Sequence, residues 1–255
     1  MPLKRTFRPL ITLVAFALVS VSAAAAPTGI RDIVLVHGAF ADGSSWSGVT
    51  AILQRKGYRV TAMQNPLTSL QDDVAATRQV LERQSDAVLL VGHSWAGAVV
   101  TEAGNAPNFK GLVYLSALVP DSDESVVELL AKRNAPMEGL QPDANGLVWL
   151  DDPQAYRKVM ASDIPLAKVR LLAAAQQPIA ARSFADKINH AAWHEKPSWY
   201  LVTENDSALA PRVQRWTAQN IGAKSASLRS SHMSLVSHPE EVAALIERAA
   251  RAVGR

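Results

Sequence analysis

The chain contains no cysteine among its 255 residues. It therefore forms no disulfide, offers no thiolate to a metal ion and has no cysteine for lipid attachment. Its histidines show no H-E-x-x-H spacing, and there is no internal repeat. The sequence accordingly predicts no metal site and no cofactor.

The chain also lacks a strong excess of charge. Its formal net charge is +3. Residues 1–26 contain Lys4, Arg5 and Arg8 and no acidic residue, so these three account for the whole excess. Because the remainder is close to neutral, we expect no nucleic-acid partner.

A long apolar run is missing too. The stretch from Pro9 to Val21 is shorter than the about 20 residues that a membrane span needs. Basic residues precede it and small residues, Ser22–Ala26, follow it, which is typical of a secretory signal peptide. We predict that residues 1–26 are such a peptide, cleaved near Ala24 or Ala26, with an uncleaved anchor as the alternative. The mature protein is then periplasmic or secreted, without stable membrane insertion.

Residues 27–255 alternate between short apolar runs and helical patterns. Strands are expected at Ile33–Val36, Tyr58–Met63, Ala87–Val91, Gly111–Leu115, Ser198–Val202 and Ser225–Leu228. Helices are expected at Ser45–Lys56, Leu70–Gln84, Ala98–Ala103, Pro211–Asn220 and Pro239–Val253. This order predicts one α/β domain with a mostly parallel sheet flanked by helices.

Residues from about 120 to 196 interrupt the alternation. They contain several prolines and short helical patterns but no obvious strand. Because ligands bind at the carboxyl ends of strands in open α/β sheets, we predict a helical cap that is inserted before the last strands and covers those ends.

Ser94 is the strongest candidate for a catalytic residue. It follows the apolar run Ala87–Val91 and precedes a helical run, so strand, tight turn and helix succeed one another around it. Gly92, Ala96 and Gly97 provide room for the close approach of strand and helix, although the spacing is G-x-S-x-A-G rather than G-x-S-x-G. This context is typical of a nucleophile elbow.

A serine nucleophile needs a histidine base and an acid that orients it, in the chain order serine, acid, histidine on this type of fold. His232 follows the last expected strand and is the predicted base, with His238 as the alternative. Asp206 follows the strand Ser198–Val202 and is the predicted acid. Glu204, and Asp121 or Asp123 after an earlier strand, remain alternatives.

Stabilising the anionic intermediate requires two backbone N–H groups. We predict that the amides of Trp95 and Ala39 supply them, and that Gly38 lets the loop come close. Phe40, Trp95, Leu118 and Met233 are expected to line an apolar substrate pocket, and His93 is a further candidate substrate contact. We expect His37 to hold its loop by hydrogen bonds.

Four stretches carry a family resemblance: IVLVHGAFADGSSW (33–46), VGHSWAG (91–97), PSWYLVTENDSALAP (197–211) and SHM (231–233). They resemble the α/β-hydrolase superfamily, in particular its branch of plant methylesterases, hydroxynitrile lyases and small bacterial esterases. The resemblance implies an α/β-hydrolase domain over 27–255. In that branch the acid is the aspartate of a T-x-x-D segment, which implies Asp206.

The resemblance also distinguishes esterases from lyases. The lyases have a threonine after the first-strand histidine and a lysine after the catalytic histidine, whereas this chain has Gly38 and Met233. We therefore expect a serine carboxylic-ester hydrolase that works through an acyl-enzyme on small acyl or aryl esters, as a monomer or homodimer. The alternatives are a ligand-binding protein that keeps the triad, a hydroxynitrile lyase, and a cofactor-free haloperoxidase-like or C–C-cleaving enzyme.

Overall fold

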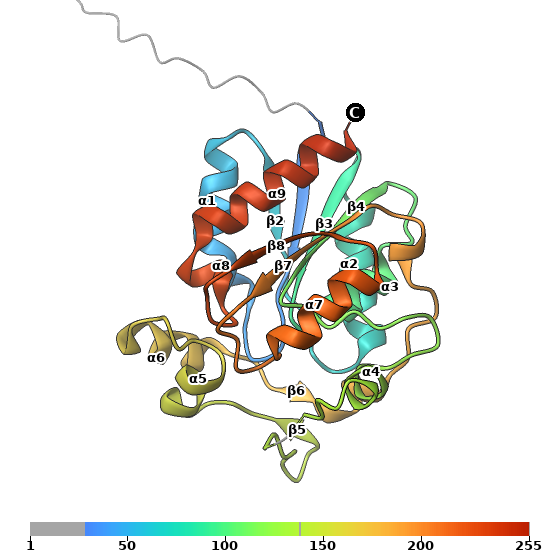
Figure 1. Cartoon of the computed structure of the whole chain (residues 1–255). Coiled ribbons are helices and arrows are strands. Elements are labelled where there is room, and N and C mark those ends of the chain that lie inside the picture. The colour runs from blue at the N-terminus through green and yellow to red at the C-terminus, as the bar shows by residue number, and fades with distance from the viewer. Residues whose placement is uncertain (1–28, 138, 255) are drawn as a thin grey trace, which may run out of the picture.

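Six parallel strands form the central sheet of the computed structural model, which describes residues 29–137 and 139–254. The predicted signal peptide lies outside these residues. The strand order is β2-β1-β3-β4-β7-β8, and Figure 1 shows this sheet at the centre of the fold. The strands are β1 (Asp32–Val36), β2 (Arg59–Ala62), β3 (Val88–His93), β4 (Phe109–Leu115), β7 (Ser198–Thr203) and β8 (Lys224–Leu228).

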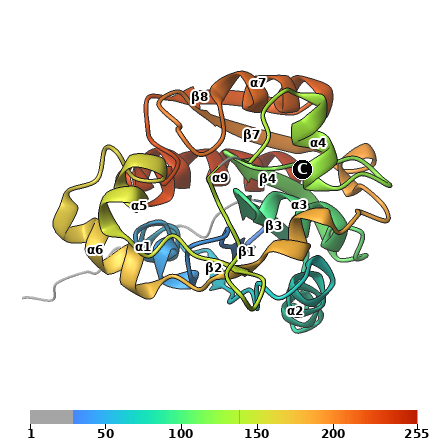
Figure 2. The same ribbon diagram turned by 90° about the horizontal axis from the view of Figure 1, so that it is seen from below.

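Helices cover both faces of this sheet, which is why the central strands β1 and β3 are buried throughout. Figure 2 shows α1 (Ser47–Arg55) and α9 (Pro239–Val253) on one side, and α2 (Leu70–Glu82) and α3 (Ala96–Ala103) on the other. The helix α7 (Pro211–Asn220) packs against β7, and a short helix, α8 (Ser234–Ser237), precedes α9. The predicted fold class, a mostly parallel sheet flanked by helices, is confirmed.

Two predicted helices begin and end as expected, α7 and α9, and each begins with a proline. The helix expected over Ser45–Lys56 is instead divided into a 3-10 helix, η1 (Gly43–Trp46), and α1. The side chain of Asp42 accepts a hydrogen bond from the Ser44 amide and so caps η1. The chain therefore turns into helical structure two residues earlier than predicted.

The segment between β4 and β7 lies at the carboxyl ends of the strands (Figure 1). It contains α4 (Val126–Lys132), α5 (Pro153–Val159), α6 (Leu166–Ala175), and the 3-10 helices η2 (Ala181–Ala185) and η3 (Ala192–His194). The expectation that it has no strand is wrong, because β5 (Leu147–Val148) and β6 (Ile179–Ala180) pair antiparallel. Strands of two residues are too short to show an alternating pattern in the sequence.

Among the helices that the structure describes, none combines the length and the apolar character needed to cross a bilayer.

Candidate active site

The turn between β3 and α3 holds Ser94 in a backbone conformation that side chains rarely adopt, with φ at 55°. Its amide donates to the Leu115 carbonyl at 3.1 Å, and its carbonyl accepts from the amides of Gly97 and Leu118 at 2.9 and 3.0 Å. A Cβ on Gly92 would lie 2.7 Å from the Ala96 carbonyl oxygen, so only glycine fits there. Strand, strained turn and helix thus succeed one another as an elbow requires, with Ser94 partly exposed at its apex.

Asp206 and His232, which are 26 residues apart in sequence, form a buried hydrogen-bonded pair. The Nδ1–H of His232 donates to Oδ2 of Asp206 at 2.7 Å. Because an ionised carboxylate only accepts hydrogen bonds, this contact puts the proton of a neutral His232 on Nδ1 and leaves Nε2 as the basic nitrogen.

The carboxylate of Asp206 is surrounded by donors. The amides of Ala208 and Leu209 donate to Oδ1, each at 2.8 Å. Oδ2 accepts from the Thr203 hydroxyl at 2.7 Å and from Gln214 Nε2 at 2.8 Å, besides His232. Burial opposes ionisation, but the charge and hydrogen bond of His232, together with these donors, hold the pKa of Asp206 below its usual value.

His93 lies between the elbow and the loop that carries His232. The two imidazole centroids are 4.7 Å apart, and His93 Nε2–H donates to the main-chain carbonyl of His232 at 3.0 Å. Burial, with the charge of His232 as a smaller cause, lowers the pKa of His93 to about 3, so this ring is neutral. The His93 ring is wholly buried and supports the loop of His232.

His93, the neighbour of Ser94 in the sequence, links the serine turn to the loop of His232. Within residues 29–137 and 139–254 the structure has no hydrogen bond between Ser94 Oγ and His232. Catalytic hydrogen bonds are often long without substrate and shorten when substrate binds.

The two predicted oxyanion donors are unengaged. In the part of the chain that the structure describes, neither the Ala39 amide nor the Trp95 amide donates a hydrogen bond to the protein. A Cβ on Gly38 would lie 2.8 Å from Ser94 Cβ and 2.9 Å from the His93 carbonyl oxygen, so glycine is needed for this approach. Next to Ala39, Phe40 has φ at 56°. The loop after β1 therefore passes directly beside the serine.

His37 holds that loop from beneath. Its Nδ1–H donates to the Gly38 carbonyl at 2.9 Å, and its Nε2 accepts from the Asn65 amide at 2.9 Å. Burial lowers the pKa of His37, which suits a neutral ring that donates at one nitrogen and accepts at the other.

The alternative acids and base make other contacts. Glu204 pairs with Arg215 at 2.5 Å, and Asp121 pairs with His194 at 2.7 Å. The Asp123 amide donates to the Ile188 carbonyl, at the edge of the inserted segment. His238 Nδ1 contacts the Ser237 hydroxyl at 2.8 Å. None of these contacts involves His232.

The remaining predicted pocket residues are buried within the core: Phe40, Trp95, Leu118 and Met233. The Phe40 carbonyl accepts from the Tyr156 hydroxyl at 3.0 Å, and that hydroxyl lies 3.9 Å from Met233 Sδ. The Met233 amide donates to the Met160 carbonyl at 3.1 Å. The inserted segment therefore contacts both the oxyanion loop and the histidine loop.

Sequence reasoning missed several side chains that hold the site. Gln214 and Tyr156 come from α7 and α5, and nothing in their local sequence indicates a partner. Asp163 accepts from the amide and the hydroxyl of Ser231 at 3.0 and 2.5 Å, just before His232. Asp73 gave a usable signal, because it is a carboxylate on the apolar face of α2.

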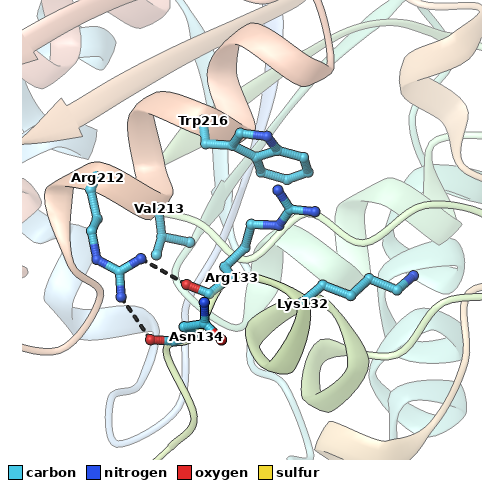
Figure 3. A pocket seen from close by; sticks show the side chains of 6 residues that line it. All are labelled: Lys132, Arg133, Asn134, Arg212, Val213 and Trp216. Atoms are coloured by element: carbon cyan, nitrogen blue, oxygen red, sulfur yellow. Dashed lines mark hydrogen bonds between the residues drawn. The ribbon is translucent and has the colours of Figure 1, made fainter.

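A hollow of about 270 Å³ lies away from these residues, between α4 and α7 (Figure 3). Arg212 donates to the carbonyls of Arg133 and Asn134, both at 2.7 Å. The Arg133 guanidinium lies 3.8 Å above the Trp216 ring. These contacts tie the end of α4 to α7, and Ser94, Asp206 and His232 do not line the hollow.

No group of three or more histidine, aspartate or glutamate side chains is arranged to hold a metal ion among the described residues.

A parallel sheet of this order, with a serine turn after a central strand, defines an α/β hydrolase. The family model described as "Alpha/beta hydrolase family" matches residues 33–245, and the chain belongs to this family.

Individual relatives agree with the predicted branch. The chain is 28% identical over 242 residues to an alpha/beta hydrolase, nvfD, from Aspergillus novofumigatus, covering 86% of this chain and 96% of that protein. It is 22% identical over 245 residues to polyneuridine aldehyde esterase from Rauvolfia serpentina, covering 83% and 92%. The solved pyrethroid hydrolase from Sphingobium faniae superposes with a TM-score of 0.76 at 23% identity, covering 87% and 98%. The predicted family is confirmed, and these relatives support the predicted class of enzyme, a carboxylic ester hydrolase.

Proposed function

We propose that the protein hydrolyses small acyl or aryl esters of carboxylic acids through an acyl-enzyme on Ser94. The observation that carries this proposal is the buried hydrogen bond of 2.7 Å between Asp206 and His232, beside a strained serine turn. The relatives named as esterases and hydrolases support the same reaction class.

In the first half of the reaction, His232 Nε2 takes the proton of Ser94 Oγ as this oxygen attacks the ester carbonyl carbon. The carbonyl oxygen becomes an anion and accepts hydrogen bonds from the amides of Ala39 and Trp95. His232 then gives its proton to the alkoxy oxygen, the C–O bond breaks, and the alcohol leaves.

In the second half, His232 deprotonates a water molecule that attacks the acyl carbon. A second oxyanion forms at the same two amides, and its collapse releases the acid and returns the proton to Ser94. Asp206 stays ionised throughout, orients His232 and stabilises its charged form, which its depressed pKa favours.

The test is steady-state hydrolysis of p-nitrophenyl acetate and butyrate by the wild type and by Ser94→Ala, followed by a panel of esters with varied acyl and alcohol parts. We expect repeated turnover that Ser94→Ala abolishes. A single burst of p-nitrophenol without turnover would contradict the enzyme proposal and favour a protein that binds ligands.

We also propose that residues 1–26 direct export. The support is their basic, apolar and small-residue order. Cell fractionation of the full chain, with Lys4→Glu/Arg5→Glu/Arg8→Glu as the comparison, tests it: the shorter mature form should appear outside the cytoplasm only for the wild type. Full-length protein in the cytoplasm for both would contradict export.

A further inference from the structure

Asp73 places a buried carboxylate beside the turn that holds Ser94, where it accepts hydrogen bonds from two N–H groups. Oδ2 accepts the indole N–H of Trp95 at 2.8 Å, and Oδ1 accepts the amide of Leu67 at 2.7 Å. The residue has no exposed surface. Burial raises the pKa of Asp73 to about 6, although these two hydrogen bonds oppose the rise. A buried carboxylate is costly for the folded state, so it needs an explanation.

Each of the two donors to Asp73 is connected to one of the two proposed oxyanion amides. Trp95 carries one of these amides itself. Its indole is held by Asp73 on one side and packs edge-on against Phe184 of η2, with ring centroids 5.2 Å apart. Asp73 therefore fixes the side chain of the residue that carries one of the two proposed oxyanion amides.

The second donor leads to the other amide through the loop before α2. Leu67 has φ at 59°, and its amide hydrogen bond to Asp73 fixes this loop. Two residues earlier, Asn65 donates its amide to His37 Nε2 at 2.9 Å and its side-chain Nδ2–H to the His37 carbonyl at 2.7 Å. His37 lies two residues before Ala39.

We propose that Asp73 is a positioning residue of the oxyanion hole: its two carboxylate oxygens hold Trp95 and the Asn65–Leu67 segment, and so set the relative positions of the Trp95 and Ala39 amides. The inference rests on the proposed function. It assigns to the carboxylate a role in kcat rather than in substrate affinity, because a shifted oxyanion hole weakens the transition state more than the ground state.

The chemistry of the two donors makes the proposal testable. Both partners of Asp73 are N–H groups, so both of its oxygens must accept. Asparagine has the same shape but one acceptor oxygen, and its NH₂ group would face an N–H. Asp73→Asn should therefore displace Trp95 or the Leu67 loop. Trp95→Phe retains an aromatic ring and removes the indole donor, so it relieves part of this conflict.

The experiment measures kcat, KM and the inhibition constant of a trifluoromethyl ketone, which forms a tetrahedral adduct with the serine, on folded variants checked by circular dichroism. For Asp73→Asn we expect kcat to fall about 10- to 100-fold, with KM changed less than about threefold and inhibitor affinity weakened in parallel with kcat. The double variant Asp73→Asn/Trp95→Phe should be no slower than Asp73→Asn, which shows the coupling of the two side chains. Asp72→Asn, at the exposed neighbouring position, is the control and should match the wild type.

A wild-type kcat and inhibitor affinity in Asp73→Asn would overturn the inference while leaving the proposed function intact. If Asp73→Asn does not fold, Trp95→Phe alone decides: lower kcat at unchanged KM supports the inference, and unchanged kcat overturns it. Absence of any Ser94-dependent turnover in the wild type would contradict the proposed function, and this inference with it.

Discussion

The two pairs of loops that build the site treat polar groups in opposite ways. In the loops after β7 and β8, the Asp206 carboxylate accepts hydrogen bonds from two amides, a hydroxyl, an amide side chain and His232. In the loops after β1 and β3, the amides of Ala39 and Trp95 have no acceptor among the described residues. His93 Nδ1, also in this region, is buried without a partner among them.

This difference follows from when each charge exists. Because its pKa is lowered, Asp206 is ionised at neutral pH whether or not a substrate is bound, so the protein itself must supply its donors. An oxyanion exists only during the reaction, so its donors must stay free until the substrate provides the acceptor. Of the two pairs of loops, only those after β1 and β3 contain strained non-glycine residues, Phe40 and Ser94, with φ at 56° and 55°.

The same contrast separates the buried carboxylates of Asp206 and Asp73. Asp206 has four donors besides His232, and its pKa is lowered, whereas Asp73 has two neutral donors and its pKa is raised to about 6. A buried carboxylate is therefore stabilised by the number and charge of its donors and not by burial as such.

The largest effect is expected from a change in the loops after β7 and β8, where the Asp206 carboxylate has its donors. Asp206→Asn cannot fix the proton of His232 on Nδ1, so kcat for p-nitrophenyl butyrate should fall by about 10²- to 10⁴-fold. Glu204→Gln, two residues away and paired with Arg215, is the matched control and should retain wild-type kcat. If Asp206→Asn keeps nearly full activity, the acid is misassigned and Glu204 or Asp121 takes its place.

The next largest effect is expected from a change in the loop after β1, which carries the Ala39 amide. Gly38→Ala adds a Cβ 2.8 Å from Ser94 Cβ, so the loop must retreat and carry the Ala39 amide with it. We expect kcat to fall about 10- to 10³-fold, as for loss of an oxyanion donor. Gly48→Ala, at an exposed position of α1, should leave kcat unchanged. Equal kcat values for the two variants would show that the loop after β1 does not take part.

The third prediction compares the pH dependence of stability in wild type and Asp73→Asn. A raised pKa in the folded state means that Asp73 favours folding most below pH 3.8, and that this contribution is lost as the pH rises to about 6. Asp72, the charged neighbour, raises the pKa in the same direction. Relative to wild type, the variant should gain up to about 3 kcal/mol of unfolding free energy between pH 4 and pH 7.

Urea unfolding at fixed temperature over that pH range measures the difference. Asp206, with its lowered pKa, acts with the opposite sign, because its contribution is lost as the pH falls below 3.8. A difference between wild type and Asp73→Asn that does not change with pH would mean that Asp73 titrates normally.

The smallest effect is expected from a variant that tests how the inserted segment supports the loop after β1. Tyr156→Phe removes the hydrogen bond of 3.0 Å to the Phe40 carbonyl and should lower stability by about 1 kcal/mol, with kcat reduced only a few-fold. Chemical unfolding and steady-state kinetics measure the two quantities. A larger loss in kcat than in Asp73→Asn would place the main support of the oxyanion loop in the inserted segment.

The fold was predictable where local chemistry decides the structure. Pro211 and Pro239 each begin a helix, and the apolar run before Ser94 forms a central strand. The proposed catalytic residues could also be selected from the sequence, because each follows a strand of a parallel sheet and the carboxyl ends of such strands meet at one edge.

The supporting residues were not predictable in the same way. Gln214, Tyr156 and Asp163 reach the site from helices or loops whose placement depends on tertiary packing, and their local sequence carries no mark of it. The strands β5 and β6 have two residues each, too few to create a pattern. Asp73 can be recognised in the sequence as a charge on an apolar helix face, but its hydrogen bond with Trp95 cannot.

The acyl-enzyme on Ser94 is the central claim, and mass spectrometry of rapidly quenched reactions tests it most directly. After mixing with p-nitrophenyl butyrate and quenching in acid, the peptide that contains Ser94 should carry a butyryl group during turnover, and should lose it as substrate is exhausted. His232→Ala should show neither turnover nor adduct. Steady turnover with no acylated Ser94 peptide, or turnover retained in Ser94→Ala, would contradict the account.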